Sequence, residues 1–389
     1  MNRGAFWGMI LAGPLLGGAA LADPADWTLG PFQAGDAQLD LGAAASGALF
    51  GGARTTQNVS GAFKLMPRLH RDYDTGLSLG LDATLAASDP LSRGRYGGDF
   101  FEKAFAEIRM GLGRVEIGQT DGAAYDLALG GPQVDAQVSL DNPQTTFFRD
   151  PSTGRAFSDA FALRTQIGAS SNDAKLTYVS PALFGAQLAL SFTPNMAKDG
   201  LPFVHAGPHV PGRQADVWEA ALRYSDDVGP VTLSGYAGLA EGRAEHKLPG
   251  QEGVSDIGAG LRADYPVNDD VSLSLGGAYR QSNAHAFNPV QSWQGATTNA
   301  ATLSASLTND SWIFGVEAGN GTAGKVAGLP RLGLNGYQAS VGYVLSPGLQ
   351  ITTGWQRLSY NRSSGAFYNG ATRIAMDAAF LHLNLHTSP

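Results

Sequence analysis

The chain contains no cysteine among its 389 residues. Disulfide-stapled secreted modules and thiolate metal sites both depend on cysteine, so the sequence excludes these two classes. After residue 22 there is also no apolar run near the roughly 20 residues that a membrane-spanning helix requires. This second absence excludes a membrane protein built from several helices. The formal net charge of −8 offers no basic surface, so no nucleic-acid partner is expected.

Glycine, in contrast, is abundant and occupies 52 positions. The glycines have no three-residue period, so the sequence is not that of a collagen. Hydrophobic residues make up 43% of the chain and charged residues 15%, a balance that can support a packed structure and does not suit a disordered chain.

Residues 1–22 have the pattern of a secretory signal peptide. Arg3 supplies a short positive region, an apolar stretch follows, and Ala20-Leu21-Ala22 forms a small-x-small cleavage site before Asp23. The alternative, a membrane anchor, is disfavoured because the stretch is short and Pro14 interrupts it. We therefore expect an exported mature chain over residues 23–389.

Alternation with a period of two dominates the mature chain. Leu77, Leu79 and Leu81 alternate with small or polar residues, and the same pattern recurs in 271–275, 301–307 and 337–343. Such alternation places one set of side chains on each face of a strand. No long stretch has a convincing 3.6-residue period, so the sequence predicts an all-β protein.

Turn-forming residues mark the connections between these strands, and short and long connections alternate along the chain. Seven short turns are expected at Asp72–Gly76, Gly111–Arg114, Pro181–Gly185, Asp226–Pro230, Pro266–Asp270, Thr308–Ser311 and Ser346–Gly348. Eight longer connections are expected at about 51–60, 89–99, 120–172, 194–215, 241–253, 282–297, 320–334 and 362–370. Fifteen connections imply sixteen antiparallel strands, with the short turns at one end and the long loops at the other.

This asymmetry is typical of a transmembrane β-barrel of the outer membrane. A strand in lipid has no water for its backbone groups, so only a closed ladder satisfies them. Aromatic residues give a second indication, because tyrosines settle at a membrane boundary. One belt is expected near the short turns from Tyr73, Tyr178, Tyr224, Tyr265 and Tyr343. The opposite belt is expected from Phe50, Tyr236, Tyr279, Trp355 and Tyr360, although aromatics also favour ordinary strands.

Two motifs add a family resemblance. The segment from Gly113 to Gly122 resembles the strand before the constriction loop of Gram-negative general porins, and Tyr178-Val179-Ser180-Pro181 with Gly185 resembles their recurrent strand–turn–strand. The order of strands and loops agrees along essentially the whole mature chain, and is most similar to alphaproteobacterial porins. The resemblance implies a homotrimer in the outer membrane of a Gram-negative bacterium, in contact with lipid and lipopolysaccharide. It also implies that the third loop, about 120–172, folds into the lumen.

Charged residues suggest where a constriction would select solutes. Up to Asp159 the third loop carries six aspartates and only two basic residues, Arg149 and Arg155, so it is net acidic. Basic residues at the inward-facing strand positions of the wall would lie opposite this loop. Fixed charges of opposite sign across a narrow passage set a transverse field. Solvated side chains without a selective role are the alternative for each residue. The candidate pore-lining residues are Lys64, Arg68, Lys103, Glu107, Arg109, Asp121, Asp126, Asp135 and Asp141.

The predicted function is a water-filled channel for passive diffusion of small hydrophilic solutes and ions. A substrate-specific uptake channel is the alternative, but it needs lumen aromatics, of which Phe105 is a candidate. An enzyme is not expected, since no Ser–His–carboxylate set is apparent and no H-E-x-x-H motif occurs. A soluble β-sandwich or adhesin is disfavoured, because such a fold does not need short and long connections in strict alternation. No cofactor is expected, and the acidic turns at Asp72/Asp74, Asp226-Asp227 and Asp269-Asp270 are either loose Ca²⁺ sites or simply solvated.

Overall fold

The structure is a computed structural model that describes most of the chain after residue 30. The described residues are 31–53, 59–88, 101–141, 162–196, 214–247, 249–285, 288–293, 297–324, 331–362 and 371–387. The expected signal peptide (1–22) lies outside them. So do the expected loop at 89–99 and the middle of the third loop, with Arg149, Arg155 and Asp159.

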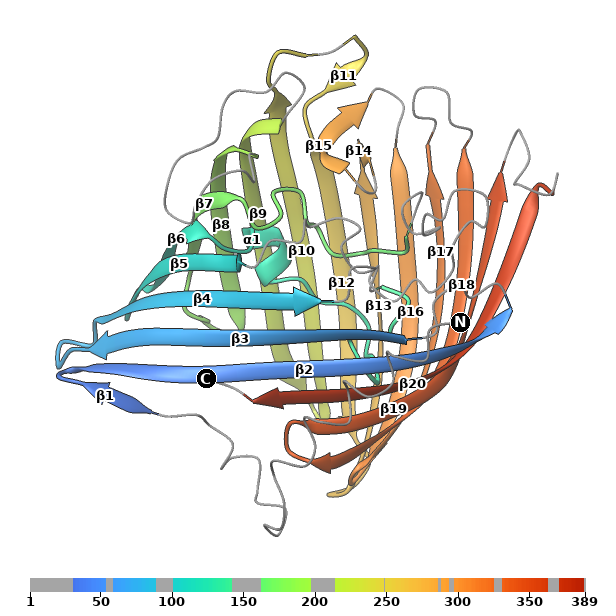
Figure 1. Cartoon of the computed structure of the whole chain (residues 1–389), viewed down its shortest axis with the longest axis horizontal. Coiled ribbons are helices and arrows are strands. Elements are labelled where there is room, and N and C mark those ends of the chain that lie inside the picture. Colours follow the sequence, from blue (N-terminus) through green and yellow to red (C-terminus); the bar gives the residue numbers. More distant parts are fainter. Residues whose placement is uncertain are drawn as a thin grey trace, which may run out of the picture.

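Sixteen antiparallel strands form a closed barrel (Figure 1). The ring closes because the last strand pairs with the first, in a register that runs from Ala43↔Thr387 to Ala53↔Asp377. The strands in ring order are β2 (Ala37–Ala53), β3 (Val59–Asp72), β4 (Ser78–Ser88), β5 (Phe101–Met110), β6 (Gly113–Gln119), β7 (Ala174–Val179), β8 (Ala186–Asn195), β9 (Gln214–Val228), β10 (Val231–Ala244), β12 (Ser255–Pro266), β13 (Val271–Ser282), β16 (Thr298–Asn309), β17 (Trp312–Ala323), β18 (Leu332–Ser346), β19 (Leu349–Arg362) and β20 (Arg373–Thr387).

Smaller elements lie outside this ring. β1 (Phe32–Ala34) pairs with the start of β2. β11 (Gln251–Glu252), β14 (Ala284–His285) and β15 (Asn288–Trp293) form a separate three-stranded sheet. The described residues contain one helix, α1 (Ala123–Asp126), which contacts β8, β9 and β10. No helix in the described ranges is long and apolar enough to cross a membrane.

The alternation of short and long connections is confirmed. Each of the seven expected short turns joins two neighbouring strands, for example β9 to β10 and β16 to β17. The first long connection was predicted too long: β2 continues to Ala53 and β3 begins at Val59, whereas the sequence predicts a loop at 51–60. β2 continues beyond Leu49, its last partner in β3, because it still pairs with β20 as far as Ala53↔Asp377.

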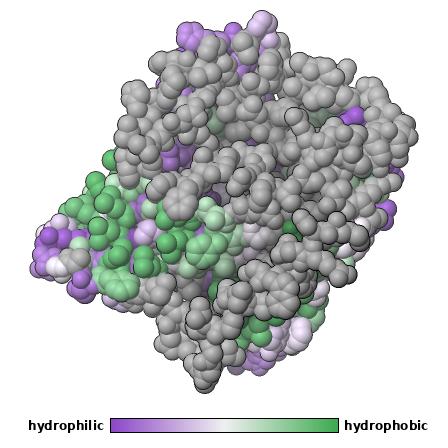
Figure 2. All heavy atoms as spheres, in the orientation of Figure 1, coloured by the Kyte–Doolittle hydropathy of each residue, from purple (hydrophilic) through white to green (hydrophobic). Residues whose placement is uncertain are grey.

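The period of two separates an exposed apolar set from a buried polar or small set. In β12, Ile257 and Leu261 are exposed, whereas Asp256 and Gly260 are buried. Figure 2 shows the apolar set on the visible face over the left part of the barrel, bordered by a hydrophilic tip at the β3–β4 turn. This is the pattern expected of a wall with hydrocarbon outside and water inside.

The aromatic belts are confirmed at one end of the barrel and partly wrong at the other. Tyr73, Tyr224, Tyr265 and Tyr343 near the short turns are exposed, and the half-buried Tyr178 donates a hydrogen bond to the Leu112 carbonyl (2.7 Å).

Near the long loops, Tyr279 and Trp355 are exposed, but Phe50, Tyr236 and Tyr360 are only 7%, 6% and 0% exposed. These three belong to the opposite parity of their strands, so they cannot reach the outer surface.

Candidate functional site

The third loop connects β6 to β7, and its described parts are 120–141 and 162–173. Its two ends are fastened to β7, β8 and β9. The buried carboxylate of Glu219 accepts hydrogen bonds from the N–H groups of Ala124 (3.1 Å) and Ser170 (3.2 Å). Lys175 donates to the carbonyls of Thr120 and Ser171, at 2.6 Å each. These bonds satisfy backbone groups that the short helix α1 and the adjoining turns leave open.

The far part of the loop is held by strands much later in the sequence. The Leu140 N–H donates to Glu317 of β17 (3.1 Å). Gln338 of β18 donates to the Val138 carbonyl, and Gln350 of β19 donates to the Val134 carbonyl, both at 2.7 Å. All three wall residues belong to the set that alternates with the exposed hydrophobic residues.

A buried pair joins the loop to the last strand. Nδ1 of His382 lies 2.5 Å from Oδ2 of Asp135, and both side chains are almost fully buried. Burial by itself would raise the pKa of the Asp135 carboxyl, but the hydrogen bond and charge of His382 outweigh it and hold this pKa below its ordinary value. The pair therefore favours an ionised Asp135 at neutral pH.

Glycines in the wall let the loop approach closely. A Cβ on Gly260 would lie 1.8 Å from the Leu129 carbonyl oxygen, and a Cβ on Gly315 would lie 2.4 Å from Cγ2 of Val134. Neither position has room for a side chain. Some of the many glycines are therefore needed where the third loop packs closely against the barrel wall.

An apolar cluster completes the attachment. It packs three loop residues, Val138, Leu140 and Leu163, against buried residues of four strands. The strand members come from β2, β18, β19 and β20 and are Ala48, Phe50, Leu332, Leu334, Leu358, Tyr360, Ile374, Met376, Ala378 and Phe380. Phe50 and Tyr360, which the sequence assigned to a membrane belt, belong to this cluster, whereas Tyr236 packs in another one with Ala123 and Leu127 of the loop.

A polar cavity of about 290 Å³ lies between the loop and the wall formed by β2, β3 and β5. Two charged wall residues, Lys64 and Glu102, form an ion pair with Nζ 2.7 Å from Oε2. The loop contributes Asp141 and Arg164, and the Arg164 guanidinium lies 5.7 Å from the centre of the Tyr125 ring. The remaining polar lining consists of Ser46, Gln133, Gln137, Ser139 and Gln166.

Asp141 is buried at the edge of this cavity. It accepts hydrogen bonds from the N–H (2.5 Å) and the hydroxyl (2.6 Å) of Thr165. Burial raises the pKa of the Asp141 carboxyl above its ordinary value, although these hydrogen bonds oppose the shift. The site thus combines two cations and two acidic groups around one cavity.

The nine candidate residues are distributed over several ion pairs. Lys64 and Asp141 line the cavity. Arg68 bonds to Glu107 (2.9 Å) and lies 3.6 Å from Asp82, and Arg109 also pairs with Glu107.

The loop aspartates have different partners. Lys103 pairs with Asp121, which joins a wall cation to a loop carboxylate. Asp126 pairs with Arg114 of β6, and Asp135 pairs with His382. Arg68 and Arg109 are therefore neutralised by carboxylates of the wall rather than of the loop.

Several residues of the site are absent from the sequence-based set. Glu102, Tyr125 and Arg164 line the cavity, and Arg164 lies just beyond the part of the loop whose charges were counted. Glu317 is the single acidic residue of β17, and Glu219 lies among small and apolar residues in the first half of β9; both belong to the inward-facing set of their strands. That parity could have singled them out, but nothing local to the sequence indicates that they bind the loop backbone.

No group of three or more acidic or histidine side chains in the described part of the chain could hold a metal ion. At one acidic turn, Asp226 accepts hydrogen bonds from the Tyr224 hydroxyl and the Asp227 N–H, at 2.9 Å each.

Comparisons with known proteins give a consistent result. The family model described as Gram-negative porin matches residues 12–363. An anion-selective porin from Comamonas acidovorans has a similar structure, with a TM-score of 0.57 at 13% identity, over 90% of this chain and 100% of that one.

Two further solved structures share the fold. A loop-deletion mutant of OmpT from Vibrio cholerae has a TM-score of 0.57 at 10% identity, over 91% of this chain and 100% of that one. OmpF of Salmonella typhi, solved with daunomycin, has a TM-score of 0.54 at 11% identity, over 90% and 98%. A comparison with curated protein sequences finds no match.

Proposed function

Because the chain belongs to the Gram-negative porin family, we propose that its third loop lies inside the barrel and sets the size and charge of the passage. The protein is an outer-membrane channel for passive diffusion of small hydrophilic solutes and ions. The proposal concerns how that channel is narrowed.

One observation carries this proposal. The cavity of about 290 Å³ has the wall of β2, β3 and β5 on one side and third-loop residues on the other. The same loop is bonded to β9, β17, β18 and β19. The loop is bonded to inward-facing side chains of these strands, and it faces β2, β3 and β5 across the cavity. It therefore extends across the inside of the barrel. The cavity is then the narrow part of the channel.

Charge selection follows from the lining of this constriction. Lys64 and Arg164 supply positive charge, and Glu102 and Asp141 supply acidic groups. The candidate residues Arg68, Lys103, Glu107, Arg109, Asp121, Asp126 and Asp135 add further charges on the wall and on the loop. In a narrow passage with low-dielectric walls, such charges select ions and orient dipolar solutes.

The absence of cysteine allows a direct test. Gln137 lines the constriction and is exposed, so Gln137→Cys introduces a single thiol there. In planar bilayers we expect the cationic thiol reagent MTSET to reduce the single-channel conductance of this variant. Leu303→Cys on the outer face, where Leu303 is 68% exposed, is the control and should not respond. If the thiol of Gln137→Cys reacts with MTSET and the single-channel conductance does not change, the loop lies outside the passage.

The proposal also covers assembly and processing. We expect a homotrimer, since OmpT of Vibrio cholerae, which shares the fold at a TM-score of 0.56 and 10% identity, is described in a trimer form. The exposed apolar set would contact outer-membrane lipid and lipopolysaccharide. We expect neither enzymatic activity nor a cofactor, and residues 1–22 should be removed on export. Light scattering of the purified protein and the mass of its N-terminal peptide check the trimer and the cleavage.

A further inference from the structure

We propose that a second cavity, at the short-turn end of the barrel, binds neutral polyhydroxylated solutes such as monosaccharides during their passage. This inference rests on the proposed function, because the cavity must lie on the permeation path. Its volume is about 350 Å³. That value falls within the range of small-molecule sites, roughly 300–1,000 Å³.

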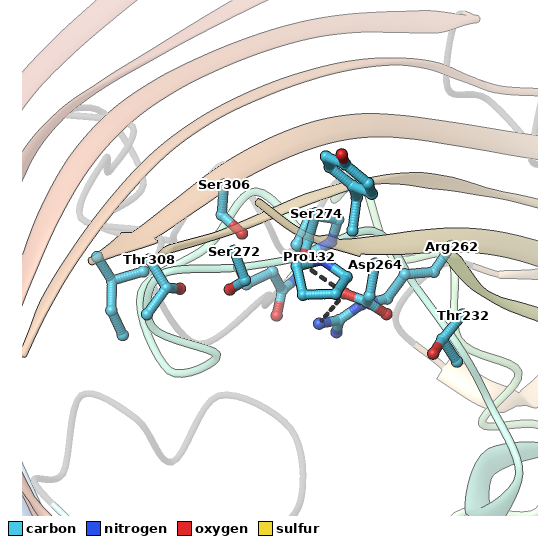
Figure 3. A pocket seen from close by; sticks show the side chains of 12 residues that line it. Pro132, Thr232, Arg262, Asp264, Ser272, Ser274, Ser306 and Thr308 are labelled. Carbon is cyan, nitrogen blue, oxygen red and sulfur yellow. Dashed lines mark hydrogen bonds and ion pairs between the residues drawn. The ribbon is translucent and has the colours of Figure 1, made fainter. Parts of the chain in front are cut away.

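Hydroxyl groups dominate the lining of this cavity. Five serine and threonine side chains, from the three strands β10, β13 and β16, contribute to it: Thr232, Ser272, Ser274, Ser306 and Thr308. Figure 3 shows Thr308, Ser272 and Ser306 toward one end of the cavity and Arg262 and Thr232 toward the other, with Pro132 of the third loop between them.

Three of these hydroxyls are available to a solute. Within the described ranges, no hydrogen bond joins the side chains of Ser272, Ser306 or Thr308 to another residue. Each hydroxyl can donate one hydrogen bond and accept two. A sugar hydroxyl has the same capacity, so a row of free serine and threonine hydroxyls matches a row of hydroxyls on the solute.

The charges in the cavity cancel. Nε of Arg262 lies 2.8 and 2.9 Å from the two carboxylate oxygens of Asp264, and the Ser274 hydroxyl donates to the same carboxylate (2.5 Å). Such a closely paired guanidinium and carboxylate attract neither anions nor cations overall. The remaining guanidinium N–H groups and carboxylate lone pairs still bond to hydroxyls, so the pair favours neutral polar solutes over ions.

The position of the cavity links it to the constriction. Gln133 lines both spaces, and Pro132 beside it forms part of the second one. A solute that leaves the constriction therefore meets the hydroxyl-lined cavity next. Pro132 and Ile313 add an apolar surface against which the C–H face of a sugar ring can pack.

Current block by sugar tests this inference. With the purified porin in planar bilayers, we expect D-glucose to reduce the KCl current in a saturable manner. Triglyme, an ether of similar mass without hydroxyl groups, should reduce the current only in proportion to its concentration. Ser306→Ala should raise the half-saturating glucose concentration about threefold, and Ser272→Ala/Ser306→Ala/Thr308→Val about tenfold or more, since each lost hydrogen bond has a modest net value.

Ser304→Ala is the matched control, because Ser304 lies on the same strand and face as Ser306 but outside the cavity. It should leave the half-saturating concentration unchanged. Normal KCl conductance without saturable glucose block would overturn the subsite and leave the channel intact. Equal sensitivity of wild type and triple variant would also overturn it. Absence of KCl conductance would reject the channel itself, and the subsite with it.

Discussion

At the scale of single residues, the buried pair of Asp135 and His382 joins the third loop to the last strand. Removing His382 would leave the Asp135 carboxylate buried without its partner. We expect His382→Ala to lower the free energy of unfolding by about 3 kcal/mol, as for other broken buried pairs. His386→Ala, an exposed histidine on the same face of β20, is the control and should have little effect. Thermal unfolding in detergent, followed by circular dichroism, measures both.

The same pair predicts a pH dependence with a definite sign. The pKa of Asp135 is lower in the folded state than in the unfolded one, so its contribution to stability is fully present above the unfolded value and is lost as the pH falls through the folded value. The loss should therefore appear below about pH 4. We expect Asp135→Asn to reduce the difference in melting temperature between pH 6 and pH 3. An equal difference in both proteins would contradict this assignment.

Charge selectivity also belongs to this scale. Lys64 pairs with Glu102, and Arg68 pairs with Glu107, which Arg109 also contacts. Replacing Lys64 and Arg68 with alanine removes two positive charges and leaves Glu102 without its partner. We expect this double variant to raise the permeability ratio of K⁺ to Cl⁻ by about twofold or more, because fixed negative charge attracts cations. Reversal potentials in a KCl gradient measure the change. Arg357→Ala removes a cation from the outer face of β19, where it pairs with Asp377, and should leave the potential unchanged.

At the scale of elements, the third loop packs closely against the wall of the barrel. Gly260→Ala would place a methyl group against the Leu129 carbonyl, and only a shift of the loop backbone can relieve that clash. We expect the displaced loop to narrow the constriction and lower the single-channel conductance. Gly235→Ala in β10, where the new Cβ meets nothing closer than 3.4 Å, is the control. An unchanged step size in Gly260→Ala would show that the loop does not limit the current.

The elements also show how far the sequence predicts the structure. The strands and the seven short turns were predictable because both depend on local signals, namely the period of two and turn-forming residues. The inward orientation of Tyr236 was missed because its place near a strand end was considered without its parity. The bond between Leu140 and Glu317 has no local signal, since these residues are far apart in the chain and meet only when the barrel closes.

For the candidate site, the sequence predicts residue types better than partners. It singled out Lys64 from its charge and strand parity and Asp141 from its charge and its place in the third loop, and both line the cavity of about 290 Å³. It assigned Arg68 to face the loop, whereas the guanidinium bonds to Glu107 on a wall strand. A guanidinium near two carboxylates pairs with the one that the side-chain geometry across neighbouring strands favours. The alternation along a single strand does not predict this partner.

At the scale of the whole molecule, closure of the ring is the condition for stability in lipid. Without β20, both β2 and β19 would expose a row of unpaired backbone groups, and each such group costs several kcal/mol in hydrocarbon. We therefore expect a chain that ends at residue 371 not to assemble in detergent or vesicles. Deleting residues 31–36 is the matched control, because β1 pairs only with the start of β2 and lies outside the ring. Gel migration with and without heating distinguishes the outcomes. The control should keep a heat-modifiable band, and the truncated chain should lose it. A folded band from the truncated chain would mean that the closing strand is dispensable.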